Sequence, residues 1–144
     1  SMDSNYFTVM KSLFPNGLGD ENIFSKMYDE SAGIKKSLRR YSLEVPSNID
    51  IGLLSVGNDG HIASLFSGDQ ALQESQNRFS LAQSPSHQHQ RITITSNYLK
   101  DIKKIYVLAI GEEKKQILNR VIESPLDHLT LPAALLTDCE WIVA

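Results

Sequence analysis

The spacing of apolar residues predicts two amphipathic helices at the start of the chain. Apolar side chains recur at helical intervals within residues 3–14, and Ser4 or Asn5 is suited to cap that helix. A second helical pattern covers residues 29–43. Its apolar stripe is Ile34, Leu38 and Tyr41, and its opposite face is Lys35, Lys36, Arg39 and Arg40. A basic cluster of this kind is typical of a solvated helix face.

Short apolar runs predict strands in the rest of the chain. Residues 49–56 form a nearly continuous apolar run after a proline, as expected for a strand buried on both faces of a parallel sheet. Residues 91–95 alternate and are rich in β-branched side chains, which favours a strand. Further strands are predicted over residues 105–110, 133–137 and 141–144.

The segments between these strands contain helical and irregular patterns. Residues 112–122 are predicted to be helical, and Ser96 or Asn97 is suited to cap a short helix. Residues 69–90 are rich in Gln, Ser and Asp, which predicts a short helix plus an exposed loop. Strands that alternate with helices imply β-α-β units. We therefore expect an α/β fold with three layers, α/β/α, around a central and mainly parallel sheet.

Composition adds the properties of one ordinary folded domain. The chain has 144 residues with 41% hydrophobic and 22% charged positions, values close to the globular average. We assign residues 3–144 to a single domain and exclude Ser1 and Met2, which resemble the remnant of a protease site. The net charge of −3 gives no electrostatic case for a nucleic acid or a membrane as partner.

Cysteine usage and hydropathy point to a compartment. The single Cys139 cannot form an internal disulfide and fits a reducing environment. No apolar run approaches the length of a membrane span, and no charged-then-apolar leader opens the chain. We therefore expect cytoplasmic localisation.

The strongest local signal for chemistry is the segment Gly57-Asn58-Asp59-Gly60-His61, directly after the strand predicted over residues 49–56. Ligands of open α/β sheets bind beyond the carboxyl ends of strands, and the two glycines permit positive φ and close ligand approach. Histidine suits general base catalysis because its ordinary pKa is about 6.5. Spacing alone equally favours a tight turn in which Asp59 caps a following helix.

Other polar candidates have structural interpretations. His87 and His89 are spaced for a metal site on a strand, but no third ligand is near in sequence, so we predict no metal site. His128 lies beside a proline-rich turn and is interpreted as structural. Cys139 has no motif that suggests nucleophilic chemistry and is interpreted as a packing residue, and Trp141 as part of the core.

Residues 57–66, Gly-Asn-Asp-Gly-His-Ile-Ala-Ser-Leu-Phe, closely resemble the signature of the 6-phosphogluconolactonase family, Gly-x-Gly-x-Asp-Gly-His-Thr-Ala-Ser-Leu-Phe-Pro-Gly. Weaker similarities occur in the family's order and extend over almost all of residues 3–144. They are Asp3-Ser4-Asn5, Arg91-Ile92-Thr93-Ile94-Thr95, Gly111-Glu112-Glu113-Lys114, Leu131-Pro132-Ala133-Ala134 and Trp141.

The sequence also departs from the family pattern. Ser55 stands where Gly is common, Asn58 where Pro or another small residue is usual, Ile62 where Thr is, and Ser67 where Pro is. None of these changes removes the acid or the imidazole. The family's Gly-rich phosphate-binding loop and its Asp-Glu-Arg segment have no counterpart here. The chain thus resembles the C-terminal part of a phosphosugar isomerase/lactonase-like fold.

The resemblance implies hydrolysis of 6-phosphogluconolactone to 6-phosphogluconate in the oxidative pentose phosphate pathway. His61 would take a proton from the attacking water, and Asp59 would orient His61 or the water. Arg91 and Lys114 would bind the substrate phosphate. Gly57 and Gly60 of the turn would also contact the substrate. An activated ester needs neither a metal nor a redox cofactor, so we expect none.

Two other functions remain open. Aminosugar-phosphate deaminase/isomerases share the Asp-Gly-His turn but continue Gly-His-Ile-Ala-Phe-Asn-Glu, whereas this chain has Ser64-Leu65-Phe66 and no following Glu, which favours the lactonase. A non-catalytic phosphosugar-binding module is the third reading. Because family segments lack a counterpart, we expect weak or no activity from this chain and self-association through an apolar edge. Some family members are fused to glucose-6-phosphate dehydrogenase, and the sequence leaves open whether the natural chain is fused in this way.

Overall fold

A computed structural model describes residues 5–17, 19, 25–86 and 89–144 of the chain. Two helices open it, α1 over Asn5–Leu13 and α2 over Ile34–Glu44, and they confirm the two predicted helices. Ser4, one of the two residues suggested as a cap for α1, lies outside the described residues. Among the described helices, none is both long and apolar enough to cross a membrane.

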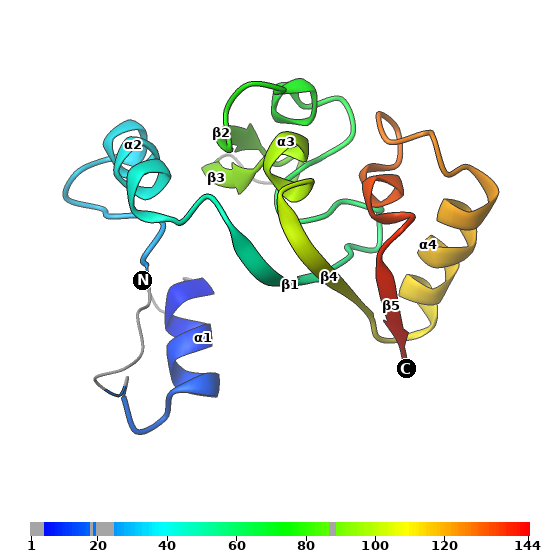
Figure 1. Cartoon of the computed structure of the whole chain (residues 1–144), viewed down its shortest axis with the longest axis horizontal. Coiled ribbons are helices and arrows are strands. Elements are labelled where there is room, and N and C mark those ends of the chain that lie inside the picture. The colour runs from blue at the N-terminus through cyan, green and yellow to red at the C-terminus, as the bar shows by residue number, and fades with distance from the viewer. Residues whose placement is uncertain (1–4, 18, 20–24, 87–88) are drawn as a thin grey trace.

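Three parallel strands form the central sheet. They are β1 (Ile49–Ser55), β4 (Ile102–Ala109) and β5 (Glu140–Val143), in the spatial order β1-β4-β5 (Figure 1). Helix α4 (Glu112–Glu123) connects β4 to the segment before β5, as the alternating pattern predicts. The mixed α/β fold with a central parallel sheet is therefore confirmed.

The segment predicted as residues 91–95 is a strand, but it lies outside that sheet. It is β3 (Gln90–Ile94), which pairs antiparallel with β2 (Phe79–Gln83) in a separate two-stranded sheet. The short helix expected in residues 69–90 is confirmed as η1 (Gln70–Gln73), whereas β2 replaces part of the expected loop. The sequence pattern of β2 does not reveal the strand, because Phe79 and Ala82, which are buried, do not alternate with polar residues.

The prediction of a strand over residues 133–137 is wrong. This segment is the 3₁₀ helix η2 (Pro132–Leu136), and Pro132 stands in its first turn, where a fixed φ favours helical entry. The short helix α3 (Ser96–Leu99) is confirmed, but its cap lies one residue earlier than suggested. The Thr95 hydroxyl accepts a hydrogen bond from the Tyr98 backbone N–H.

The core lies on one face of the central sheet. Ile105 and Val107 of β4 pack there with Ile117 and Val121 of α4, and all four side chains are buried. The expectation that residues 49–56 are buried on both faces is wrong. Ile51 and Leu53 are each 64% exposed on the opposite face. The register places Tyr106, Leu108 and Ile142 on the same face, and we call these five side chains the open face.

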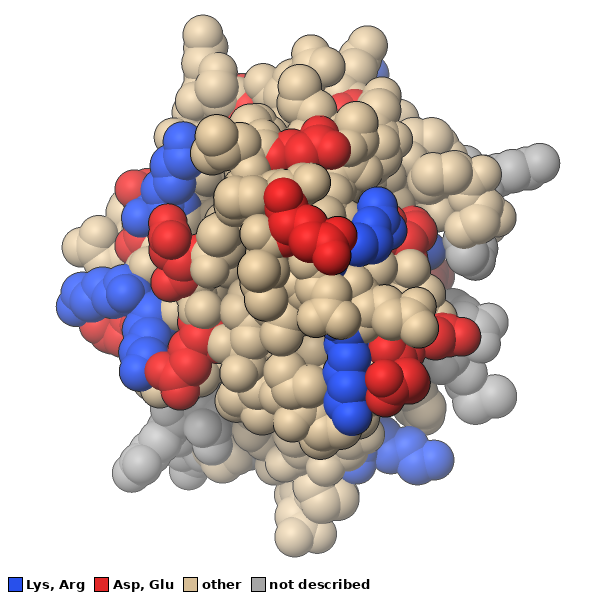
Figure 2. Space-filling view, turned by 90° about the vertical axis from the view of Figure 1, so that its right-hand side faces the viewer, with Lys and Arg blue, Asp and Glu red and all other residues tan. Residues whose placement is uncertain are grey.

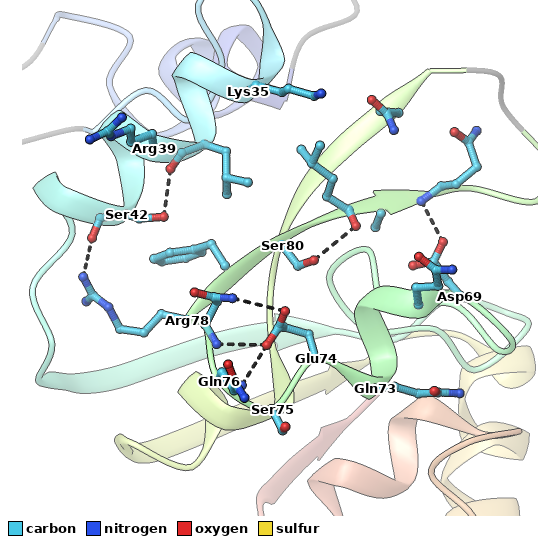
Figure 3. Close-up of a pocket in the computed structure, with 18 of the residues that line it drawn as sticks. Lys35, Arg39, Ser42, Asp69, Gln73, Glu74, Ser75, Gln76, Arg78 and Ser80 are labelled. Carbon is cyan, nitrogen blue, oxygen red and sulfur yellow. Dashed lines mark hydrogen bonds between the residues drawn. The ribbon is translucent and has the colours of Figure 1, made fainter.

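A smaller apolar cluster joins the β2–β3 sheet to α2. The ring of Phe79 lies edge-on to Tyr41 at 4.9 Å and to Tyr98 at 5.1 Å between centroids. Arg78 donates a hydrogen bond to the carbonyl oxygen of Ser42 in the last turn of α2 (Figure 3). It also donates to the carbonyl oxygens of Val45 and Pro46, which follow α2. The β2–β3 sheet is therefore fixed to the end of α2 and to the segment that leads into β1.

Candidate functional site

The predicted catalytic pair lies in a tight turn that follows β1, formed by residues 57–61 and called the histidine turn here. The Gly57 N–H donates to the His61 carbonyl at 2.8 Å, and the Gly60 N–H donates to the Gly57 carbonyl at 3.0 Å. Gly60 has a φ of 87°, the left-handed region that favours glycine. A Cβ at Gly57 would lie 2.2 Å from His61 Nδ1, so the imidazole ring packs directly on the backbone there.

Asp59 and His61 form a hydrogen-bonded pair. Asp59 Oδ1 lies 2.6 Å from His61 Nδ1 and also accepts from the His61 backbone N–H at 3.1 Å. Partial burial raises the pKa of Asp59, but these hydrogen bonds outweigh it, so the pKa of the carboxyl lies below its ordinary value. An ionised carboxylate only accepts, so the Nδ1 position carries the proton and Nε2 is left as the acceptor of the neutral ring.

The segment after the turn is buried rather than helical. Ile62 and Leu65 are fully buried, and Phe66 is 3% exposed. The alternative in which Asp59 caps a following helix is therefore wrong, because residues 62–66 form turns with isolated bridges to Val56 and within the segment. This burial anchors the histidine turn in the core and leaves the His61 ring at the surface.

Residues of two other predicted motifs form hydrogen bonds to the histidine turn and to the segment that follows it. The Ser64 N–H donates to the hydroxyl of Thr93 on β3 at 3.0 Å. The Ala133 N–H, at the start of η2, donates to the Gly60 carbonyl at 2.9 Å. Sequence reasoning did not identify Thr93 or Ala133 as supports, because their role depends on contacts between segments far apart in the chain. The only sequence signal was their membership of the quoted motifs.

Arg91 and His61 contact the same aromatic ring. The His61 and Phe66 ring centroids are 4.8 Å apart, and the Arg91 guanidinium lies 6.0 Å from the Phe66 centroid. Arg91 is half-buried on β3. Phe66 thus contacts both the imidazole and the guanidinium, a role that the sequence did not reveal.

Lys114 also reaches the carboxyl end of β1. It is the third residue of α4, and its Nζ donates to the Ser55 Oγ at 3.0 Å. Asn58 of the histidine turn donates to the carboxylate of the neighbouring Glu113. The four residues predicted to carry chemistry are therefore linked to one strand end: Asp59 and His61 by the turn, Lys114 by Ser55, and Arg91 by the Phe66 ring.

The structure places the remaining candidates as follows. Within the described part of the chain, no group of three or more His, Cys, Asp or Glu side chains could hold a metal ion, and His87 lies outside that part. Trp141 packs against the core and donates from Nε1 to the Leu136 carbonyl at 3.0 Å. Cys139 packs against the same core, and burial raises the pKa of its thiol. His128 is exposed.

A groove of about 1270 Å³ lies elsewhere, between α2, η1 and β2 (Figure 3). None of the six predicted site residues lines it. Its two carboxylates accept hydrogen bonds from the backbone. Asp69 accepts from the Ala71 and Gln83 N–H groups, and Glu74 accepts from those of Gln76 and Asn77. On the side of the molecule shown in Figure 2, acidic and basic side chains are interspersed, so that side presents no patch of one sign to a charged polymer.

Comparison with known proteins gives a family and relatives. The model of the family "Glucosamine-6-phosphate isomerases/6-phosphogluconolactonase" matches residues 1–143. The chain is 33% identical over 125 residues to a 6-phosphogluconolactonase of Chlamydia pneumoniae, a match that covers 86% of this chain and 48% of the relative. The chain thus spans about half the length of that relative.

Solved structures resemble the fold. A 6-phosphogluconolactonase from Thermotoga maritima is similar with a TM-score of 0.75 and 26% identity, over 99% of this chain and 67% of that one. A monomeric glucosamine-6-phosphate deaminase is similar with the same TM-score of 0.75, but with 19% identity, over 99% of this chain and 65% of that one. The second likeness therefore concerns the fold alone.

Replacing Gly57 by alanine should displace the His61 ring. The new Cβ would meet Nδ1 at 2.2 Å and Asp59 Oδ1 at 2.7 Å, so the Asp59–His61 hydrogen bond cannot persist unchanged. We expect changed imidazole nitrogen shifts in NMR spectra and a loss of about 1–3 kcal/mol in the free energy of unfolding. Gly52→Ala on β1, where the closest contact is 3.2 Å to a side-chain methyl group, is the control. Unchanged His61 signals in Gly57→Ala would contradict the arrangement.

Acidification should remove the stability contributed by the Asp59–His61 pair. The folded-state pKa of Asp59 lies below its ordinary value of 3.8. The contribution is therefore present above the ordinary value and is lost as the pH falls through the lowered one. We expect Asp59→Asn to be less stable than wild type in urea at pH 7 and to approach it at pH 2.5. Glu123→Gln, an exposed carboxylate at the end of α4, is the control, and a pH-independent difference for Asp59→Asn would refute the assignment.

Proposed function

Because the chain belongs to the glucosamine-6-phosphate isomerase/6-phosphogluconolactonase family, we propose that it carries the catalytic part of a 6-phosphogluconolactonase, within a single domain of residues 3–144. The observation that carries the proposal is the Asp59–His61 pair at the end of β1, with Arg91 and Lys114 linked to the same strand end. The name of the relative at 33% identity supports the same substrate class.

In the proposed reaction, His61 is the general base. Its Nε2 takes a proton from a water molecule while the water oxygen forms a bond to the lactone carbonyl carbon. The bond between that carbon and the ring oxygen then breaks, and the departing oxygen receives the proton from the imidazolium. Asp59 keeps the ring in the tautomer that this step requires, and its negative charge stabilises the imidazolium. No net electron transfer occurs, so the step needs no redox partner.

The two basic side chains suit the phosphate of the substrate. Arg91 offers a planar fork of donors, and Lys114 offers a compact positive charge. Binding the phosphate away from the reacting carbonyl would hold the lactone ring in attacking geometry beside His61. Phe66 is buried and contacts both His61 and Arg91, so it gives both side chains a rigid support.

The deaminase/isomerase alternative is less well supported. Its pattern has Phe-Asn-Glu directly after Gly-His-Ile-Ala, whereas this chain has Ser-Leu-Phe at the same three positions, residues 64–66. Leu65 and Phe66 are buried, so no carboxylate is supplied to His61 from these positions. A non-catalytic phosphosugar-binding module is distinguished by the activity assay, because such a module would bind 6-phosphogluconate without turnover.

Replacing His61 by alanine should abolish most lactone hydrolysis. In the complete protein, with freshly made 6-phosphogluconolactone and correction for spontaneous hydrolysis, we expect a drop of roughly a hundredfold or more, the usual scale for a lost general base. We also expect the wild-type chain to stay below about 10⁴ M⁻¹s⁻¹ in kcat/KM, because the family's Gly-rich phosphate loop has no counterpart in it.

The control for this assay is His89→Ala, since His89 is exposed and lies outside the histidine turn. Near-wild-type turnover by His61→Ala would place the base elsewhere. Binding of 6-phosphogluconate without any turnover by the complete wild-type protein would favour the non-catalytic module.

We also propose that two copies of the chain associate through β1. This strand is at the edge of the described sheet, and its own apolar side chains on the open face, Ile51 and Leu53, are exposed. Antiparallel pairing of two β1 strands about Gly52 would place Ile51 of one copy opposite Leu53 of the other. The strand is therefore complementary to a second copy of itself.

Sedimentation velocity tests this association. Leu53→Lys should shift the chain towards the monomer, because an edge lysine opposes strand pairing. Leu43→Lys is the matched control, since Leu43 is 80% exposed on α2, away from the sheet. A monomeric wild type, or equal effects of the two variants, would refute the proposed contact.

A further inference from the structure

Ser55 and Asn58 connect the histidine turn to the first turn of α4. The Lys114 Nζ donates to Ser55 Oγ at 3.0 Å, and the Asn58 amide donates to the Glu113 carboxylate. Two consecutive helix residues are thus held by two residues that flank Gly57. We call these two hydrogen bonds the α4 clamp.

The clamp depends on side chains that depart from the family pattern. Ser55 stands where Gly is common and Asn58 where Pro or another small residue is usual. Glycine has no side chain to accept a hydrogen bond, and proline has no amide to donate one. The clamp is therefore a property of this chain's own sequence rather than of the Asp-Gly-His turn itself.

A hydrogen bond to Ser55 lowers the conformational entropy that Lys114 loses when it binds an anionic ligand. A free lysine has a long, flexible stem and loses rotamer freedom when it is fixed on a ligand. Ser55 fixes the ammonium at the end of β1 in advance and uses one of its three donors. Among the described residues, the Lys114 ammonium makes no other side-chain hydrogen bond, so two donors remain for a phosphate oxygen.

We propose that Ser55 is a positioning residue that pre-orients Lys114 for the substrate phosphate, and that Asn58 holds the neighbouring Glu113 so that the first turn of α4 stays on the histidine turn. This inference rests on the proposed function only for the identity of the ligand. The geometry itself, Ser55 against Lys114 and Asn58 against Glu113, is independent of the reaction.

Calorimetric titration of the whole chain tests the role of Ser55. The ligands are 6-phosphogluconate and gluconate, which lacks the phosphate. Ser55→Ala should weaken 6-phosphogluconate binding by about threefold to tenfold, the range that one net hydrogen bond gives. Ser55→Thr keeps the hydroxyl and should restore the affinity. Gluconate binding should be equal in all three proteins, and in the lactone assay Ser55→Ala should raise KM and leave kcat unchanged.

A double-mutant cycle separates positioning from a general structural effect. In a Lys114→Met background, Ser55→Ala should have no further effect on 6-phosphogluconate binding. Lys115→Met is the matched lysine control, because Lys115 is the next residue of α4 and pairs with Glu112 at 3.4 Å. Ser80→Ala is the serine control, because the Ser80 hydroxyl donates to the neighbouring Leu81 carbonyl.

Asn58 is tested by amide hydrogen exchange. The Lys114 and Lys115 N–H groups both donate to the Gly111 carbonyl, at 3.1 and 3.2 Å, in the first turn of α4. Asn58→Ala should speed exchange of these two amides and leave the later amides of α4 unchanged. Unchanged exchange would overturn the role assigned to Asn58.

The outcomes distinguish this inference from the proposed function. Equal weakening of gluconate binding, or an undiminished Ser55→Ala effect without Lys114, overturns the positioning role. A wild type that neither binds 6-phosphogluconate nor hydrolyses the lactone refutes the proposed function instead. In that case NMR signals of the Lys114 ε-methylene decide the inference: they must become more mobile in Ser55→Ala, and equal mobility overturns it.

Discussion

The lack of a side chain at Gly57 is the constraint on which the site depends. The imidazole of His61 occupies the space that a Cβ would need, 2.2 Å from Nδ1 and 2.7 Å from Asp59 Oδ1. Because the ring lies against the backbone, Asp59 two residues earlier reaches its Nδ1 without leaving the turn. The carboxylate–imidazole pair is thus formed within a turn of five residues.

Such a short turn keeps its geometry only if the surrounding core holds it. Ile62 and Leu65 are fully buried beneath it, Thr93 of β3 accepts from Ser64, and Ala133 of η2 donates to Gly60. These contacts come from three separate parts of the chain. Rigid packing of the support and exposure of the imidazole are therefore two consequences of the same burial.

The sequence predicted the parts of the fold that local patterns determine. Both long amphipathic helices, α2 and α4, and the strands β1, β4 and β5 follow from periodicity and apolar runs. The predictions from sequence were wrong where contacts between distant segments determine the structure. The apolar run at 133–137 fits a strand as well as a helix, and Pro132 with burial of η2 selects the helix. The pattern of residues 49–56 indicates a strand but does not reveal that Ile51 and Leu53 are exposed on one face of it.

The candidate site divides in the same way. Asp59 and His61 were visible to physical reasoning because they follow a strand directly, whereas Arg91 and Lys114 were suggested by resemblance to a family. Their spatial link to the histidine turn arises through Phe66 and Ser55, and neither contact has a sequence signal of its own. Ser55 shows why departures from a motif carry information. The substitution leaves the acid and the imidazole untouched, yet it adds a hydrogen-bond acceptor next to a basic side chain, and so changes how that charge is held without changing which charge is present.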